Sequence, residues 1–138
     1  MADVRQIRDK QPDNEKITIN LGFVDLGRID LLVQEGFYSN RSDFIRTAIR
    51  QHLDTHGDAV DRSIARHTME LGLRDLGRSE LEQLRAAGEV LHIKVVGLAR
   101  IGSDVTPELA RATIASITVL GSLQASADIK KALADRIH

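Results

Sequence analysis

One short segment near the N-terminus limits what this chain can fold into. Residues 16–21, Lys-Ile-Thr-Ile-Asn-Leu, alternate polar and apolar side chains, which is typical of a β-strand with one buried face. A single strand is unstable because its backbone donors and acceptors need a partner, and the sequence offers no second strand nearby. We therefore expect a homodimer in which two copies of the segment pair as an antiparallel ribbon, with apolar side chains at the interface: Ile17, Ile19 and Leu21.

Two amphipathic helices are predicted after this segment. Apolar side chains recur at helical spacing over residues 24–35, and Gly36 is the expected end of that helix. Ser39 is of a type that caps helix N-termini, and Asp43 would lie in the first turn of a second helix, where the helix dipole favours an anion. The strand and the two helices form one unit over residues 16–56.

The second half of the chain contains an internal repeat. Residues 93–97 and 117–121 align at an offset of 24 residues, and a weaker copy begins at residue 68. Each copy has the pattern of a strand followed by a helix, which is typical of small α/β repeats with parallel strands. We therefore expect the α+β class, with the strand–helix–helix unit followed by an α/β repeat unit. The remaining boundaries are a flexible arm over 1–15, a linker helix over 57–67 and the repeat unit over 68–138.

The strands of the repeat carry apolar side chains on both faces. Ile93 and Val95 can pack against the helices of the repeat, whereas Val96 and Leu120 lie on the opposite face. The same helices cannot cover both faces of one sheet. We expect Val96 and Leu120 to be covered by the linker helix or by a partner chain, and we predict them as oligomer-interface residues.

The composition and motifs exclude several kinds of chemistry. The chain has no cysteine, which excludes disulfides, thiolate zinc sites and cysteine nucleophiles. The closest pair among its five histidines, His52 and His56, has no third ligand within reach, so we predict no metal site. The sequence contains no Gly-rich phosphate loop, no Gly-x-Ser-x-Gly and no His-Glu-x-x-His. We therefore predict neither catalytic residues nor a cofactor.

Charge and hydropathy limit the environment and the partners. The formal net charge is −1, so no broad basic surface coats the molecule, although a few Arg and Lys residues can still form a small site. No apolar run approaches the roughly 20 residues that span a bilayer, and the first fifteen residues are too polar for a signal peptide. We expect a cytoplasmic protein that does not contact membranes.

The N-terminal unit resembles the ribbon-helix-helix family of DNA-binding regulators, the CopG/Arc/MetJ type. Residues 16–21 resemble the strand of that family, and residues 36–46, Gly-Phe-Tyr-Ser-Asn-Arg-Ser-Asp-Phe-Ile-Arg, resemble the start of its second helix. The resemblance covers roughly residues 15–55. It departs from the family pattern at Asn20, where a small hydroxyl residue is common, and at Gly27, which interrupts the first helix. The resemblance implies a homodimer that places its ribbon in the major groove of double-stranded DNA.

The resemblance also assigns DNA contacts to individual residues. The outward side chains of the ribbon would contact base edges, and the amide of Asn20 suits adenine. The free amides at the start of the second helix would contact phosphate. The predicted base-contacting residues are Lys16, Thr18 and Asn20, and the predicted phosphate-contacting residues are Ser39, Asn40, Arg41 and Ser42.

These observations favour a sequence-specific transcriptional regulator that acts as a repressor or autoregulator. Dimerisation is expected through the ribbon, and further assembly through the α/β repeat unit. One alternative is the antitoxin of a toxin–antitoxin pair, in which the C-terminal part grips a toxin. Another is a scaffold protein that self-assembles without binding DNA.

Overall fold

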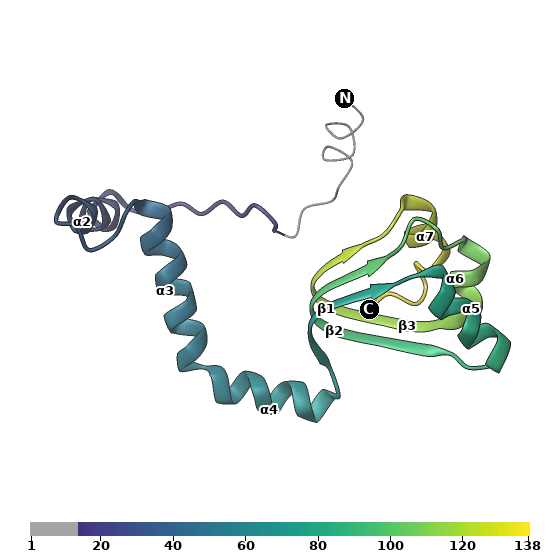
Figure 1. The fold of residues 1–138 in the computed structure, drawn as a ribbon. Helices are drawn as coiled ribbons and strands as arrows, with labels where there is room; N and C mark the ends of the chain where they lie inside the picture. The colour runs from purple at the N-terminus through teal and green to yellow at the C-terminus, as the bar shows by residue number, and fades with distance from the viewer. Residues whose placement is uncertain (1–13) are drawn as a thin grey trace. The chain divides into compact units, whose positions relative to one another are not determined.

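The structure is a computed structural model and describes residues 14–138. The described chain divides into two compact units, residues 14–63 and 64–138, a helical unit and a unit built on a sheet (Figure 1). The mixture of helices with a separate parallel sheet confirms the predicted α+β class. Most of the arm predicted over residues 1–15 lies outside the described residues. None of the helices in residues 14–138 has both the length and the hydropathy that crossing a bilayer requires.

The N-terminal unit consists of an irregular segment and helices. Residues 15–22 have no regular secondary structure, and the helices that follow are Phe23–Gln34 (α2), Arg41–Thr55 (α3) and Gly57–His67 (α4). Gly36 follows the end of α2, as predicted. Its left-handed backbone, with φ of 88°, turns the chain so that the Phe37 amide donates to the Leu32 carbonyl at 3.0 Å. The residues of α4 are those of the predicted linker helix.

The strand predicted over residues 16–21 does not form in the single chain. Its apolar side chains are exposed, with 78% of Ile17 and 62% of Ile19 open to solvent. A strand forms only when a neighbouring strand bonds its backbone, and the three paired strands in residues 14–138 all belong to the C-terminal unit. The single chain therefore has a strand sequence but lacks the partner that strand formation requires.

Three parallel strands alternate with three helices in the C-terminal unit. Along the chain these are Glu70–Leu76 (β1), Arg78–Ala87 (α5), Leu91–Ile101 (β2), Pro107–Thr113 (α6), Ile114–Gln124 (β3) and Ala127–Ala132 (α7). The strands lie in the order β1-β2-β3 and all pairs are parallel, which confirms the predicted arrangement. The β2 and β3 strands have 11 residues each and extend beyond the repeated motif, because their alternation of apolar side chains continues on both sides of it.

The core of this unit lies between one face of the sheet and the three helices (Figure 1). Alternate side chains of the strands point to this face, and Ile93, Val95 and Ile117 are at most 3% exposed. Leu81 of α5 and Leu109 of α6 pack against them and are equally buried. The other members of the core are Leu76, Ala99, Ile101, Val105, Ala110, Ile114, Ile129 and Leu133.

A row of three glycines allows the sheet to bend. Gly72, Gly97 and Gly121 are in register across the three strands, with φ angles of 123°, 138° and 122° that side chains rarely permit. A Cβ on Gly97 would overlap the carbonyl oxygen of Gly72, and a Cβ on Gly121 would overlap that of Gly97. Figure 1 shows β2 and β3 bending sharply part-way along their length. The sheet can therefore curve around its core only because this row has no side chains.

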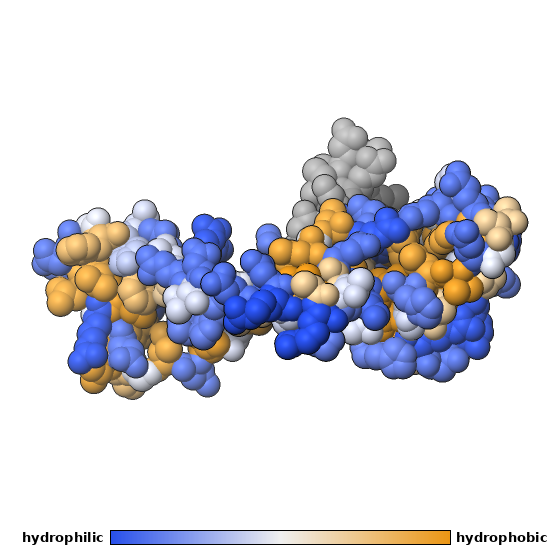
Figure 2. Space-filling model, turned by 90° about the horizontal axis from the view of Figure 1, so that it is seen from below, coloured by the Kyte–Doolittle hydropathy of each residue, from blue (hydrophilic) through white to orange (hydrophobic). Residues whose placement is uncertain are grey.

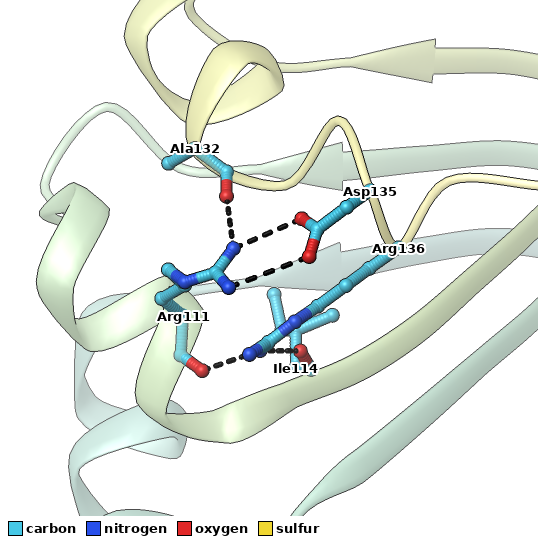
Figure 3. Close-up of polar contacts among 5 residues, drawn as sticks. All are labelled: Arg111, Ile114, Ala132, Asp135 and Arg136. Carbon is cyan, nitrogen blue, oxygen red and sulfur yellow. Dashed lines mark hydrogen bonds and ion pairs between the residues drawn. The ribbon is translucent and has the colours of Figure 1, made fainter.

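The C-terminal residues are held against β3 by two arginines (Figure 3). Arg111 of α6 donates to the Ala132 carbonyl at 2.8 Å and to the Asp135 carboxylate at 2.9 Å. Arg136 donates to the carbonyls of Arg111 and Ile114. The hydrogen bonds from Arg111 lower the pKa of Asp135 below its ordinary value. These contacts bring the last residues of the chain alongside the first half of β3.

The face of the sheet opposite the helices carries apolar side chains that remain exposed. Leu71, Val96 and Leu120 form one row across β1, β2 and β3 on this face, and Leu71 and Leu120 are 68% and 60% exposed. Val96 lies between them and is half-buried. In the single chain no described segment covers this row, so the prediction that Val96 and Leu120 lie at an oligomer interface stays open.

The close approach of the strands at the glycine row predicts a specific loss of stability. Gly97→Ala should reduce the free energy of unfolding by more than about 3 kcal/mol, because it combines a strained φ with overlap of a neighbouring carbonyl. Gly88→Ala is the matched control. Gly88 also has a positive φ, of 69°, but a Cβ there would meet open space, so this change should cost only about 1–2 kcal/mol. Urea unfolding followed by circular dichroism measures both values, and equal losses would contradict the close approach.

Candidate nucleic-acid interface

The N-terminal unit has an open apolar hollow instead of a closed core. The hollow has a volume of about 390 Å³. Ile29 is the one buried hydrophobic residue among residues 14–63, at 6% exposed. Figure 2 shows hydrophobic side chains open to solvent on this unit. The apolar residues that line the hollow are Ile19, Leu21, Ile29, Leu32, Phe44, Ile45, Ala48 and Ile49.

The predicted base-contacting residues lie on the irregular segment that borders this hollow. Ile19 and Leu21 line the hollow, whereas Asn20 between them does not. Lys16, Thr18 and Asn20 are all exposed. The structure thus separates apolar from polar side chains over residues 19–21, whereas Ile17 is as exposed as its polar neighbours and the strand that would align the polar set does not form.

The second helix of the unit begins one residue later than predicted. Asn40, not Ser39, is the N-cap of α3, and its side-chain oxygen accepts a hydrogen bond from the Asp43 amide at 2.8 Å. The Asp43 carboxylate in turn accepts from the Ser39 amide at 2.9 Å. The first predicted cap was wrong because Asn at this position reaches the amide three residues on, as a capping side chain must. The amides of Arg41 and Ser42 occupy the first helical positions and have no partner within the helix.

The side chain of Arg41 is already engaged within the unit. Its Nε and Nη2 donate to the two carboxylate oxygens of Asp30 on α2, each at 2.8 Å. This bidentate pair joins the end of α2 to the start of α3. The hydrogen bonds raise the pKa of Arg41 and lower that of Asp30. Nη1 keeps its two donors for another acceptor, so the pair with Asp30 orients the guanidinium without using all its donors.

Three residues of this site were not predicted from the sequence in these roles. Asp30 binds Arg41, Asn40 caps α3, and Tyr38 packs edge-on against Phe44 with ring centroids 5.0 Å apart. The Asn40-Arg-Ser-Asp43 spacing is a cap signature that could have identified the N-cap. No local pattern links Asp30 to Arg41, because the partners lie on different helices 11 residues apart.

The histidine pair at the end of α3 has no third candidate ligand near it among the described residues. The rings of His52 and His56 contact each other edge-on, with centroids 4.9 Å apart. Within residues 14–138 no three His, Asp or Glu side chains gather closely enough to hold a metal ion.

Comparison of the sequence with known protein families identifies the family of this chain. A profile of the ribbon-helix-helix transcriptional regulator family matches residues 12–130. The chain belongs to this family. The match extends well beyond residues 15–55, so it includes most of the sheet unit of this ribbon-helix-helix protein. Membership implies DNA binding and dimerisation, and the family is in general one of regulators and not of enzymes. No curated protein and no solved structure matches the chain.

The Asp30–Arg41 pair predicts how the stability of this ribbon-helix-helix unit depends on pH. The pKa of Asp30 is lower in the folded state than its ordinary value of 3.8, so its carboxylate contributes stability above pH 3.8. That contribution is lost as the pH falls through the lowered folded pKa. We expect the wild type to be more stable than Asp30→Asn at pH 7, with the difference disappearing in strong acid. Urea unfolding over a pH series measures it.

The control for this prediction removes the partner. In an Arg41→Gln background, Asp30→Asn should have little effect at any pH, because the pair that lowers the pKa is absent. A stability difference between wild type and Asp30→Asn that is constant from pH 7 to strong acid would contradict the assignment.

Proposed function

We propose that this protein is a sequence-specific transcriptional repressor or autoregulator whose dimeric antiparallel ribbon enters the major groove of double-stranded DNA. The observation that carries the proposal is the unpaired segment of residues 15–22 beside an open apolar hollow, within a chain of the ribbon-helix-helix family. Such a regulator would act in the cytoplasm together with the DNA it binds.

A second copy of the chain would give residues 16–21 a strand partner and would cover the open apolar hollow of the N-terminal unit. Pairing two copies of residues 16–21 gives their backbone groups hydrogen-bond partners. It also covers Ile17, Ile19 and Leu21 over the hollow. Complete burial of such a side chain contributes about 1.5–3 kcal/mol, and a dimer buries each of them twice. The stability of the unit is therefore tied to dimer formation, which supports the ribbon as the dimer interface.

The polar side of the ribbon would then face outward from the dimer. A two-stranded ribbon fits the width of the major groove, where the base pairs differ in their donors and acceptors. Lys16, Thr18 and Asn20 from both copies would reach base edges. The two α3 N-termini would flank the ribbon, with the amides of Arg41 and Ser42 and the side chains of Ser39, Asn40 and Arg41 near phosphate.

The sheet unit would extend the assembly. The exposed row that contains Val96 and Leu120 lies on a sheet face that parallel sheets normally bury, which supports a contact with another chain.

The two alternative functions are an antitoxin and a scaffold. The antitoxin alternative expects a bound toxin, and the scaffold alternative expects no DNA binding. The compact sheet core argues against the short, unfolded tail that antitoxins often use.

Loss of one base contact should lower specificity. Asn20→Ala should weaken binding to the cognate duplex by about 1–3 kcal/mol and should affect random duplex DNA much less. Gln51→Ala is the control, because it removes an exposed amide from α3 that the proposal places away from bases. Fluorescence anisotropy measures the affinity of each variant for a cognate duplex, selected from the DNA upstream of the protein's own gene, and for a random duplex. Equal losses on cognate and random DNA would mean that the ribbon does not contact bases.

Loss of one phosphate contact should act on all sequences alike. Arg41→Ala should weaken cognate and random DNA equally and should reduce the slope of log affinity against log salt by roughly one unit per lost contact, or about two for a dimer. Arg50→Ala changes the net charge by the same amount but lies on the exposed side of α3, so its slope should stay near that of wild type. Identical slopes for the wild type and Arg41→Ala would remove Arg41 from the interface.

A further inference from the structure

The two outer edges of the sheet differ in the structure. On the β3 edge, the Ile117 amide donates to the Arg136 carbonyl at 2.8 Å, and the His138 amide donates to the Ile117 carbonyl at 2.8 Å. The chain's own C-terminal residues therefore cover the first half of that edge. On the β1 edge, no strand in residues 14–138 pairs with the outer side. Except for Leu76, the side chains of β1 are exposed or half-buried. A strand with open backbone groups and exposed apolar side chains is a template for another strand.

We propose that β1 pairs with β1 of a second copy of this chain, antiparallel and centred on Gly72, so that the two three-stranded sheets join into one. The contact is separate from the N-terminal ribbon and does not rest on DNA binding. Its partner is identified by the sequence of β1 itself, because that sequence is complementary to its own reverse.

The register follows from a two-fold axis through Gly72. In an antiparallel pair with Gly72 opposite Gly72 of the second copy, Leu71 lies opposite Leu73 and Glu70 lies opposite Arg74. Each end of the pair thus matches a carboxylate with a guanidinium, and the middle matches two leucines. Opposite charges and apolar pairs at directly opposed positions stabilise antiparallel strands, whereas like charges there are unfavourable. Antiparallel pairing about this centre places no like charges opposite each other.

The charged groups at the two ends can form this contact without leaving their present partners. Arg74 donates from Nη2 to Glu80 of α5 at 2.6 Å, and its Nε lies 3.8 Å from the Glu70 carboxylate of the same chain. A guanidinium has five donors, so further donors remain for the carboxylate of a second Glu70. The Glu70 side chain is 68% exposed, which leaves it accessible from outside the strand.

Gly72 leaves space where the second backbone would approach. The equivalent glycines of β2 and β3 are crowded on the side towards β1, since a Cβ on either would overlap the carbonyl oxygen of the preceding strand. Gly72 has the same unusual φ, but a Cβ there would meet nothing within 4 Å. The outer side of β1 therefore has both the open backbone and the missing side chain that close strand approach requires.

Cysteine pairs can test the register directly, because the natural chain has no cysteine. In the proposed pairing, residue 71 lies opposite residue 73 of the second copy, with Cα atoms about 4.5–5.5 Å apart. This is within the span of a disulfide, whose Cα separation stays below about 7 Å. Residues 71 and 71 of the two copies are diagonal neighbours at about 7–8 Å and should link poorly. Leu71 and Leu73 are 68% and 57% exposed, so their replacement should not disturb folding.

The experiment uses the full-length chain with oxidised glutathione as the oxidant and a non-reducing gel as the readout. Leu71→Cys/Leu73→Cys should form a covalent dimer of twice the 15.2 kDa chain mass, and each single variant should remain mostly unlinked. The single variants are the matched controls, because each keeps one exposed thiol of the pair but cannot form the link between residues 71 and 73. Circular dichroism of each variant establishes that it is folded.

The outcomes distinguish this contact from its alternatives. A folded double variant that stays monomeric on the gel would overturn the proposal. Single variants that link as readily as the double variant would also overturn it, because that result indicates packing between sheet faces and not strand pairing. The result does not depend on DNA, so a protein that fails to bind DNA can still show the β1 contact, and a protein that binds DNA can still lack it.

Discussion

In both units of this protein, backbone hydrogen-bonding groups without a strand partner indicate where a second chain can pair. In the N-terminal unit, residues 16–21 have the alternation of a strand but remain irregular, because one copy cannot supply the second strand. The hollow beside them stays open for the same reason. Within residues 14–138, the sheet of the C-terminal unit satisfies its inner backbone groups, and no strand pairs with the outer side of β1. Both proposed contacts between copies of the chain would satisfy backbone groups that one copy leaves without a strand partner.

Much of this arrangement follows from patterns that are local in the sequence. The helix predicted over residues 24–35 is present as Phe23–Gln34, because its apolar spacing and the Gly36 that follows it lie within one short segment. The repeat at an offset of 24 residues correctly predicts parallel strands, since each copy returns the chain in the same direction. The alternation of residues 16–21 is visible in the sequence, but these residues form no strand in the single chain. Its formation depends on a second molecule, which no local pattern supplies.

The features that could not be predicted join distant parts of the chain. The bend of the sheet depends on three glycines that only become neighbours once the strands are in register, although each glycine is visible in the sequence. The Asp30–Arg41 pair joins two helices whose relative placement depends on the turn between them. The candidate DNA site therefore divides into a part that rests on alternation in the sequence, which stays a prediction, and a part set by helix packing, which the sequence does not show. The second part decides how the Arg41 guanidinium is oriented, and so which of its donors remain for an acceptor other than Asp30.

The C-terminal residues that lie along β3 have a consequence for the size that any sheet-based assembly can reach. A repeat of strand and helix with two open edges could add copies head to tail without limit, and such growth ends in a filament. Here the contacts of Arg111 and Arg136 fix the chain terminus against one of the two edges. With the first half of the β3 edge covered, β1 is the edge that can pair along its whole length, and growth through the proposed β1 contact would stop once two such strands had met. Residues 136–138 would thus limit the proposed assembly to a pair, and their removal would uncover the first half of the β3 edge.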